Sequence, residues 1–298
     1  MIPFFDLHCD TLGVAYDKDI SLYSDSLQAS LLYAESISPY IQVGAIWSDY
    51  RFDNEECFVR YKKAIGYARA QGIKEIKNVG DLKKSGYILA VEDARLLNGN
   101  LSRIKELKND GIKIITPMWR GQNQLGGAWD TDIGLSNFGI DAIKECVFNS
   151  IIVDVSHASY KSFFQIADLM QKHNKSFIAS HSNSYTIYPH RRNLTDEQFS
   201  FIKEQDGIIG INLVPQHLSP NKADISVILS HIYHFLSIGG ENILCFGCDF
   251  DGTDALPEEI ASMYDISKLY GFIEKELGKS ITNKLFYQNA FNFFSRNI

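Results

Sequence analysis

Six residues that can bind divalent metals or move protons lie far apart in the sequence, each at the end of a short apolar run. They are His8 and Asp10 in DLHCDTL, Glu92 in ILAVEDA, His157 in VDVSHAS, His181 in IASHSNS and Asp249 in FGCDFDG. Imidazole nitrogens and carboxylate oxygens are the donors that zinc and similar ions take from proteins. Their shared placement predicts a single metal-binding pocket.

Five of these residues have the spacing and chemistry of ligands to two ions. His8 and Asp10 are two apart, so on a strand both side chains point to the same side and can reach one ion. Glu92 has two carboxylate oxygens that can bridge two ions, and His157 with His181 would complete the second site. Each also has an ordinary alternative: a half-buried strand end for the first pair, a helix cap or ion pair for Glu92, and a structural role for either later histidine.

Asp249 is expected to move protons. Paired ions about 3.5–4 Å apart polarise a carbonyl and hold a bridging hydroxide, because zinc lowers the pKa of water to about 7. We predict that Asp249 accepts the proton of this water and passes it to the leaving amine. Asp251, two residues later, is the weaker candidate and has a helix cap as its alternative role.

The segment PHRRN follows the sixth apolar run and contains Arg192. An arginine near paired metals can clamp a substrate carboxylate with two parallel hydrogen bonds. The alternative is a surface arginine pair in a loop before a helix. The remaining histidines are predicted to be solvated or structural: His173, His217, His231 and His234.

Strand-like and helix-like patterns alternate along the chain. The eight strand-like runs are mostly continuously apolar, as in strands covered on both faces, and span 2–10, 41–47, 86–94, 112–119, 150–157, 175–182, 207–214 and 242–250. Helical spacing fills intervals between them, over 56–72, 101–111, 160–174, 195–207 and 224–240. This alternation predicts an α/β fold, a TIM-type (β/α)8 barrel, in one domain over 1–298. In such a barrel all strand ends open onto one face.

Three local signals refine this interpretation. Ser102 is predicted as a helix N-cap, and Thr195 as another with Gln198 completing a capping box. Gly111 is expected to end the helix that begins near Ser102. The polar, glycine-rich segment 120–139 is long enough to be a loop that covers the substrate.

The composition suits a globular enzyme, with 45% hydrophobic and 22% charged residues among 298. The net charge of −7 gives no electrostatic reason to expect nucleic acid or an anionic membrane as partner. We expect no signal peptide, membrane-spanning helix or lipid anchor. Five cysteines without zinc-knuckle spacing, Cys245 and Cys248 among them, are expected to be buried thiols of a cytoplasmic protein.

The sequence resembles the membrane (renal) dipeptidase family of dinuclear zinc peptidases, nearly end to end. The resemblance rests on DLHCDTL, AVED, GLSNFG, VDVSHAS, ASHSNS, HRRNL, GIIGIN and FGCDFDG in the family's order, and FYQNAFNFF resembles its closing helix. It implies a zinc-dependent dipeptidase that tolerates a D-residue at the C-terminal position and contains two Zn²⁺ per chain. A homodimer is a further expectation from the family.

The resemblance also implies roles for individual residues. One zinc would lie on His8, Asp10 and Glu92, and the other on Glu92, His157 and His181, with Glu92 bridging. Asp249 matches the aspartate beside the bridging water. Arg192 matches the arginine that binds the substrate's terminal carboxylate.

Trp119 departs from the family pattern, because the family usually has a substrate-contacting histidine there. Tryptophan donates one N–H but carries no positive charge, and loss of an oxyanion-stabilising donor typically costs about 10²–10³ in turnover. Either another residue such as Arg120 replaces it, or the substrate differs. The alternative function is therefore a related dinuclear metal amidohydrolase acting on a non-dipeptide amide, lactone or phosphoester. A non-catalytic metal-binding scaffold is a third hypothesis, against which the presence of all six residues argues.

Overall fold

Eight parallel strands form the centre of the molecule. The computed structural model describes the backbone of residues 1–298 and every side chain except that of Glu35. The strands are hydrogen-bonded in the order β5-β4-β3-β2-β1-β8-β7-β6. Their bounds are β1 (Ile2–Cys9), β2 (Ile37–Trp47), β3 (Gly86–Glu92), β4 (Ile114–Thr116), β5 (Ile152–Val153), β6 (Ile178–Ala179), β7 (Ile208–Ile211) and β8 (Leu244–Phe246).

The two ends of this strand order also meet, which nearly closes the sheet. Asp154, just after β5, forms a parallel bridge with Ile178 of β6, and the Val155 N–H donates to the Ile178 carbonyl at 2.8 Å. The TIM-type (β/α)8 barrel predicted from the alternating pattern is confirmed. The strands β4, β5 and β6 are shorter than predicted, and beyond β5 the pairing with β6 is carried by the single bridge of Asp154 to Ile178.

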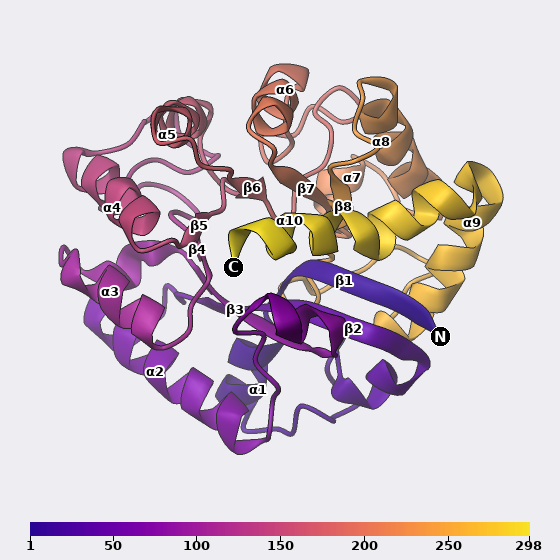
Figure 1. Ribbon diagram of the computed structural model, residues 1–298, viewed down its shortest axis with the longest axis horizontal. Coiled ribbons are helices and arrows are strands. Elements are labelled where there is room, and N and C mark those ends of the chain that lie inside the picture. Colours follow the sequence, from indigo (N-terminus) through magenta and orange to yellow (C-terminus); the bar gives the residue numbers. More distant parts are fainter.

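A ring of helices surrounds the strands, and α10 crosses in front of them in Figure 1. The helices are α1 (Thr11–Lys18), α2 (Asn54–Ala70), α3 (Ser102–Asn109), α4 (Asn137–Phe148), α5 (Tyr160–Lys172), α6 (Asp196–Glu204), α7 (Pro215–Leu218), α8 (Ile225–Ser237), α9 (Ile266–Asn283) and α10 (Asn289–Asn297). Short 3-10 segments span Leu31–Ser36, Val79–Lys83, Ala94–Leu97 and Met263–Asp265, and a π-helical turn spans Lys284–Gln288. Within the described chain, no helix combines the length and hydropathy needed to cross a membrane.

One predicted helix cap is correct and one is wrong. Thr195 Oγ1 accepts from the Gln198 N–H at 3.2 Å, and Gln198 Oε1 accepts from the Thr195 N–H at 3.0 Å, which confirms the capping box. Ser102 is not an N-cap but the first residue of α3. The Asn100 side chain accepts from the Ser102 N–H at 3.0 Å, so the capping oxygen comes from two residues earlier.

The C-terminal segment seals the amino end of the barrel. Phe286 packs against Phe4 and Phe246, with ring centroids 5.7 and 4.8 Å away, and Phe294 stacks on Phe5 at 5.0 Å. All five rings are fully buried. Because β1 runs from this end toward His8 and Asp10, the opposite end of the barrel is left open for a site.

Two glycines allow the end of β6 to lie tightly against its neighbours. A Cβ atom on Gly210 would lie 1.9 Å from the Ser180 carbonyl oxygen, and one on Gly247 would lie 1.7 Å from it. The Ser182 N–H donates to the Gly210 carbonyl at 2.7 Å across the same contact. Only a residue without a side chain permits this approach, which fixes the position of His181.

We predict that Gly247→Ala lowers the free energy of unfolding by about 1–3 kcal/mol or more, because the backbone must move to admit the methyl group. Gly66→Ala is the matched control, since Gly66 is exposed in α2 and a Cβ there would meet no atom within 4 Å. That change is expected to stabilise by about 0.5–1 kcal/mol through helix propensity. Urea unfolding measures both, and equal stability of Gly247→Ala and wild type would contradict the tight contact.

Candidate active site

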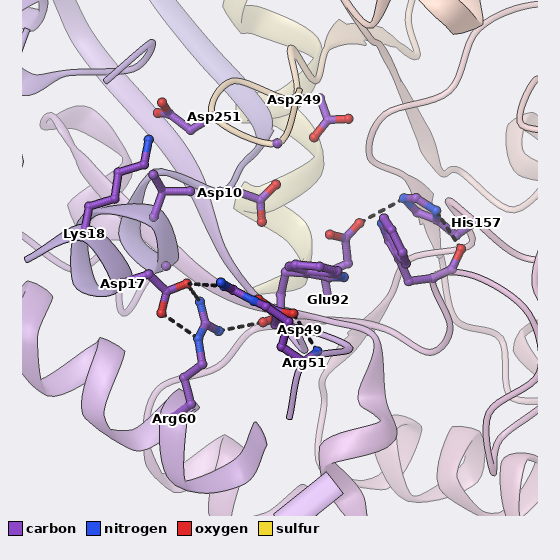
Figure 2. A pocket seen from close by; sticks show the side chains of 15 residues that line it. Asp10, Asp17, Lys18, Asp49, Arg51, Arg60, Glu92, His157, Asp249 and Asp251 are labelled. Carbon is purple, nitrogen blue, oxygen red and sulfur yellow. Dashed lines mark hydrogen bonds and ion pairs between the residues drawn. The ribbon is translucent and has the colours of Figure 1, made fainter. Parts of the chain in front are cut away.

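The six residues predicted from the strand ends lie together at the carboxyl end of the barrel. They form three overlapping groups in which the potential ligand atoms all lie within 4.8 Å of one another. The groups are His8, Asp10 and Glu92; Glu92, His157 and His181; and His8, His181 and Asp249. Figure 2 shows Asp10, Glu92, His157 and Asp249 around the pocket that they line.

Pairing at the strand ends brings these side chains into register. Glu92 ends β3 opposite Trp47 of β2 and Thr116 of β4. Beyond the paired residues of β1 and β8, the Asp249 N–H donates to the His8 carbonyl at 3.1 Å, and the Asp10 N–H donates to the Phe250 carbonyl at 2.9 Å. Backbone hydrogen bonds therefore hold Asp249 beside the His8–Asp10 pair.

Glu92 lies at the centre of the group. Its Oε1 atom is 3.7 Å from His8 Nε2, 3.0 Å from His157 Nε2 and 3.5 Å from His181 Nε2. Glu92 therefore belongs to both of the ligand sets predicted from the sequence. One carboxyl group thus contacts imidazoles from β1 and from the ends of β5 and β6, all three through the same oxygen.

Several buried polar atoms of the site have no protein partner. Among the described side chains, these include His8 Nε2, Asp10 Oδ1 and Glu92 Oε1. A buried polar atom without a partner costs about 1–3 kcal/mol, and more if it is charged. A divalent cation accepts lone pairs from this set of nitrogen and oxygen atoms, so the residues fit such an ion.

Hydrogen bonds fix the tautomers of the two later histidines. His157 Nδ1 lies 3.0 Å from the Trp119 carbonyl oxygen, which only accepts, so this nitrogen carries the proton. His181 Nδ1 lies 2.7 Å from Ser180 Oγ, whose own hydroxyl donates to the Asp154 carboxylate at 2.6 Å. The two Nε2 lone pairs consequently face each other at 2.8 Å. Such lone pairs repel unless a cation lies near both.

Burial sets the protonation of the cluster. It lowers the pKa of His157 and of His181 well below the ordinary value, with neighbouring cationic groups adding to the effect, so both are the neutral imidazoles that bind metals. Burial raises the pKa of Glu92 well above its usual value. It also raises the pKa of Asp249 to about 6, which His8 opposes and Asp10 reinforces.

Strained backbone marks the same end of the barrel. His157, Asp249 and Asp251 have φ angles of 70°, 62° and 64°, in the left-handed region that residues with a side chain rarely adopt. Such conformations cost on the order of 1–3 kcal/mol and cluster at functional sites. The Trp129 N–H helps to hold one of them by donating to the His157 carbonyl at 2.8 Å.

A cavity of about 370 Å³ opens beside the cluster. Trp119 lines it, with its ring 6.0 Å from that of His157 and 4.9 Å from that of Trp47, and its contact with the substrate stays a prediction. Arg192 is buried and is not among the residues that line this cavity. Its Nη2 donates to the His181 carbonyl at 3.3 Å, and its Nε has no partner among the described residues. Segment 120–139 contributes no residue to the lining of this cavity in the described chain, and its role as a loop that covers the substrate stays a prediction.

Comparison with protein families decides the class. The family model described as Membrane dipeptidase (Peptidase family M19) matches residues 55–296. The chain belongs to the membrane dipeptidase family. It is thus a peptidase of a metal-dependent, dipeptidase type, as the resemblance of its motifs had implied. His8 and Asp10 precede the matched range, and the barrel itself brings them to the other ligands.

The chain is also similar to other proteins and to solved structures. An uncharacterised protein of Klebsiella pneumoniae, encoded in the pqqA 5′ region, is 27% identical over 72% of this chain and 83% of its own length. The crystal structure of the dipeptidase AC, a metallo peptidase, superposes with a TM-score of 0.92 at 22% identity, over 99% of this chain and 98% of that one. A metallo peptidase from Rhodobacter sphaeroides superposes with a TM-score of 0.88 at 21% identity, over 100% of this chain and 99% of that one. These structures share the barrel fold.

The other polar residues considered for the site, Asp251 and four histidines, have structural roles in this membrane dipeptidase homologue. Asp251 does not cap a helix: it accepts from the backbone N–H groups of Gln28 and Ala29 at 2.7 and 3.1 Å, and from the Thr11 hydroxyl at 2.6 Å. It joins the loop after β8 to the start of α1. The four histidines predicted to be solvated or structural have such roles in the structure: His173, His217, His231 and His234. His217 lies in α7 rather than in the loop that the sequence predicted.

Sequence reasoning missed one buried carboxylate that supports the site. Asp154 Oδ1 accepts from the N–H groups of Ser156 and Ser180, both at 2.9 Å, and Oδ2 accepts from the hydroxyls of Thr116 at 2.7 Å and Ser180 at 2.6 Å. Through Ser180 it holds the ring of His181. Carboxylates one step behind a ligating histidine orient the ring and raise its basicity. The sequence contained an indication of this role, because an aspartate inside an otherwise apolar strand, as in SIIVDVSH, is rarely solvated.

We predict that Asp154→Asn weakens metal binding about 10- to 100-fold, because an amide cannot accept all four hydrogen bonds and releases Ser180. Competition with a chromogenic chelator measures the affinity without relying on activity. The exposed Asp168 of α5 supplies the control, Asp168→Asn, which should bind metal like wild type. Wild-type affinity in a folded Asp154→Asn variant would refute the supporting role.

Proposed function

We propose that this protein is a dinuclear zinc dipeptidase. The supporting observation is the position of Glu92, whose Oε1 lies 3.0–3.7 Å from three imidazoles that belong to two different ligand sets. Nitrogen and oxygen donors of this kind suit zinc. The proposed ligands of the first ion are His8, Asp10 and Glu92, and those of the second are Glu92, His157 and His181.

The chain's own groups would perform the remaining chemistry. When bound, paired zinc ions polarise a carbonyl and activate water at neutral pH. Asp249 faces the cavity, and its Oδ1 lies 3.8 Å from His8 Nε2. From there its carboxylate accepts the proton of the attacking water and delivers it to the nitrogen of the departing amine.

Arg192 is the proposed partner of the substrate's C-terminal carboxylate. Its buried Nε–H has no partner in the described chain, so a ligand oxygen would satisfy a donor that is costly to leave unpaired. The Rhodobacter sphaeroides metallo peptidase was solved with a phosphinate mimic of L-Ala-D-Ala. A D-residue at the C-terminal position is therefore part of the proposal for this chain.

Trp119 favours a second candidate function, hydrolysis of a cyclic amide, lactone or phosphoester by the same metal centre. Its indole and that of Trp47 give the cavity an apolar wall where the family usually has a cationic donor.

We also propose a cytoplasmic location. The support is that all five cysteines are free, buried thiols, as expected in a reducing compartment.

A substrate panel tests these candidates. We expect the zinc-loaded protein to hydrolyse L,L and L,D dipeptides, chelation to abolish the reaction and zinc to restore it. Asp249→Asn should lower kcat about 10²- to 10⁴-fold, the usual contribution of a general base or acid, while retaining bound zinc. Turnover of lactones or phosphoesters with none of dipeptides would instead support the second candidate.

A further inference from the structure

The cavity continues past the proposed zinc ligands to a charged end formed by three segments. Figure 2 shows Asp17 and Lys18 of α1, Asp49 and Arg51 from the loop after β2, and Arg60 of α2 along this wall. None of these five residues belongs to the metal-binding cluster. Their pairing determines which charge the end presents to a ligand.

The Arg60 guanidinium neutralises Asp17. Its Nε and Nη2 donate to the two carboxylate oxygens of Asp17 at 2.8 and 2.5 Å, and Nη1 donates to the Trp47 carbonyl at 2.7 Å. The Arg60 side chain is only 8% exposed. A bidentate pair with such burial is a fixed part of the wall and is unavailable to a ligand.

Arg51 forms an ion pair with the second carboxylate at this end, that of Asp49. Asp49 accepts from Arg51 Nε at 2.7 Å and from the Arg51 backbone N–H at 2.8 Å. The Asp49 side chain is 5% exposed, whereas that of Arg51 is 72% exposed. The anion is thus covered, and the cation that covers it extends into solvent at the cavity mouth.

Lys18 is the cation that remains. No carboxylate of the described chain lies within 4.0 Å of its ammonium group. Figure 2 shows its side chain extending toward the loop that carries Asp251, whose oxygens are already bonded to Thr11 and to backbone N–H groups. A ligand carboxylate would find a free cation here, while a ligand cation would find both neighbouring anions engaged.

We propose that Lys18, with Arg51 in the same cavity wall, selects dipeptides that carry an acidic side chain. The inference rests on the proposed dipeptidase function and names its substrate class. The carboxylate of an aspartyl or glutamyl side chain would extend from the scissile bond toward α1 and accept from the Lys18 ammonium. A hydrogen bond to a charged group of this kind is worth roughly a tenfold preference or more.

Matched substrates isolate this contact. The zinc-loaded protein is given dipeptides that differ only in Glu, Gln or Lys, at each of the two positions, and kcat/KM is measured for each. For wild type we expect glutamyl substrates to exceed glutaminyl ones about tenfold at the position that faces Lys18. The preference should decline as salt is added, since this end of the cavity is open to solvent.

Variants then assign the preference to the residue. Lys18→Gln should bring the Glu-over-Gln ratio of kcat/KM close to one by lowering the value for the glutamyl dipeptide, and Lys18→Glu should favour the lysyl dipeptide. Arg51→Gln should reduce the ratio less, and Lys105→Gln, at an exposed lysine of α3, should leave it at the wild-type value. An equal loss on both substrates in Lys18→Gln would indicate a structural role and overturn the proposal.

Two failures are distinguishable. If neutral dipeptides are hydrolysed but the wild-type Glu-over-Gln ratio is near one, the dipeptidase function stands and the acidic preference is wrong. If no dipeptide of any charge is hydrolysed by protein that contains zinc, the proposed function itself is wrong, and the inference falls with it.

Discussion

The carboxylate of Glu92 lies buried between three imidazoles, and this contact constrains the rest of the structure. A buried carboxyl group needs close polar partners, and here the partners come from β1 and from the ends of β5 and β6. Those segments lie far apart in the sequence, so only a closed barrel brings their ends within a few ångströms. The unpaired buried atoms that remain, such as His8 Nε2 and Asp10 Oδ1, are those that a pair of cations would satisfy.

The surrounding structure keeps this arrangement rigid. Below the site, the C-terminal aromatic residues close the opposite end of the barrel. Beside it, Gly210 and Gly247 let the backbone at Ser180 approach two neighbouring strands. Behind it, Asp154 holds Ser180 and so the ring of His181. Trp119, which departs from the family pattern, still supports His157 through its backbone carbonyl, a contact that does not depend on the side chain.

The sequence predicted the features that depend on periodicity and on strand ends. Continuous apolar runs predicted the barrel, and the polar residues that end five of the eight runs predicted the cluster around Glu92. Features formed between distant segments were not predictable. The Arg60–Asp17 pair joins residues 43 positions apart, and Lys18 is distinctive only because no carboxylate of the described side chains lies within 4.0 Å of its ammonium group. The helix α1 itself was missed, since eight residues of TLGVAYDK contain a glycine and two β-branched side chains.

We propose separate tasks for two parts of one cavity: bond cleavage at the cluster around Glu92, and choice of the substrate at the charged wall. The proposed cleavage needs two ions that share Glu92, and anomalous diffraction at the zinc absorption edge tests this directly on crystals of the zinc-loaded protein. The predicted result is two peaks about 3.5–4 Å apart, one beside His8 and Asp10 and one beside His157 and His181, with Glu92 between them. A single peak, or peaks that Glu92 does not join, would contradict the dinuclear centre.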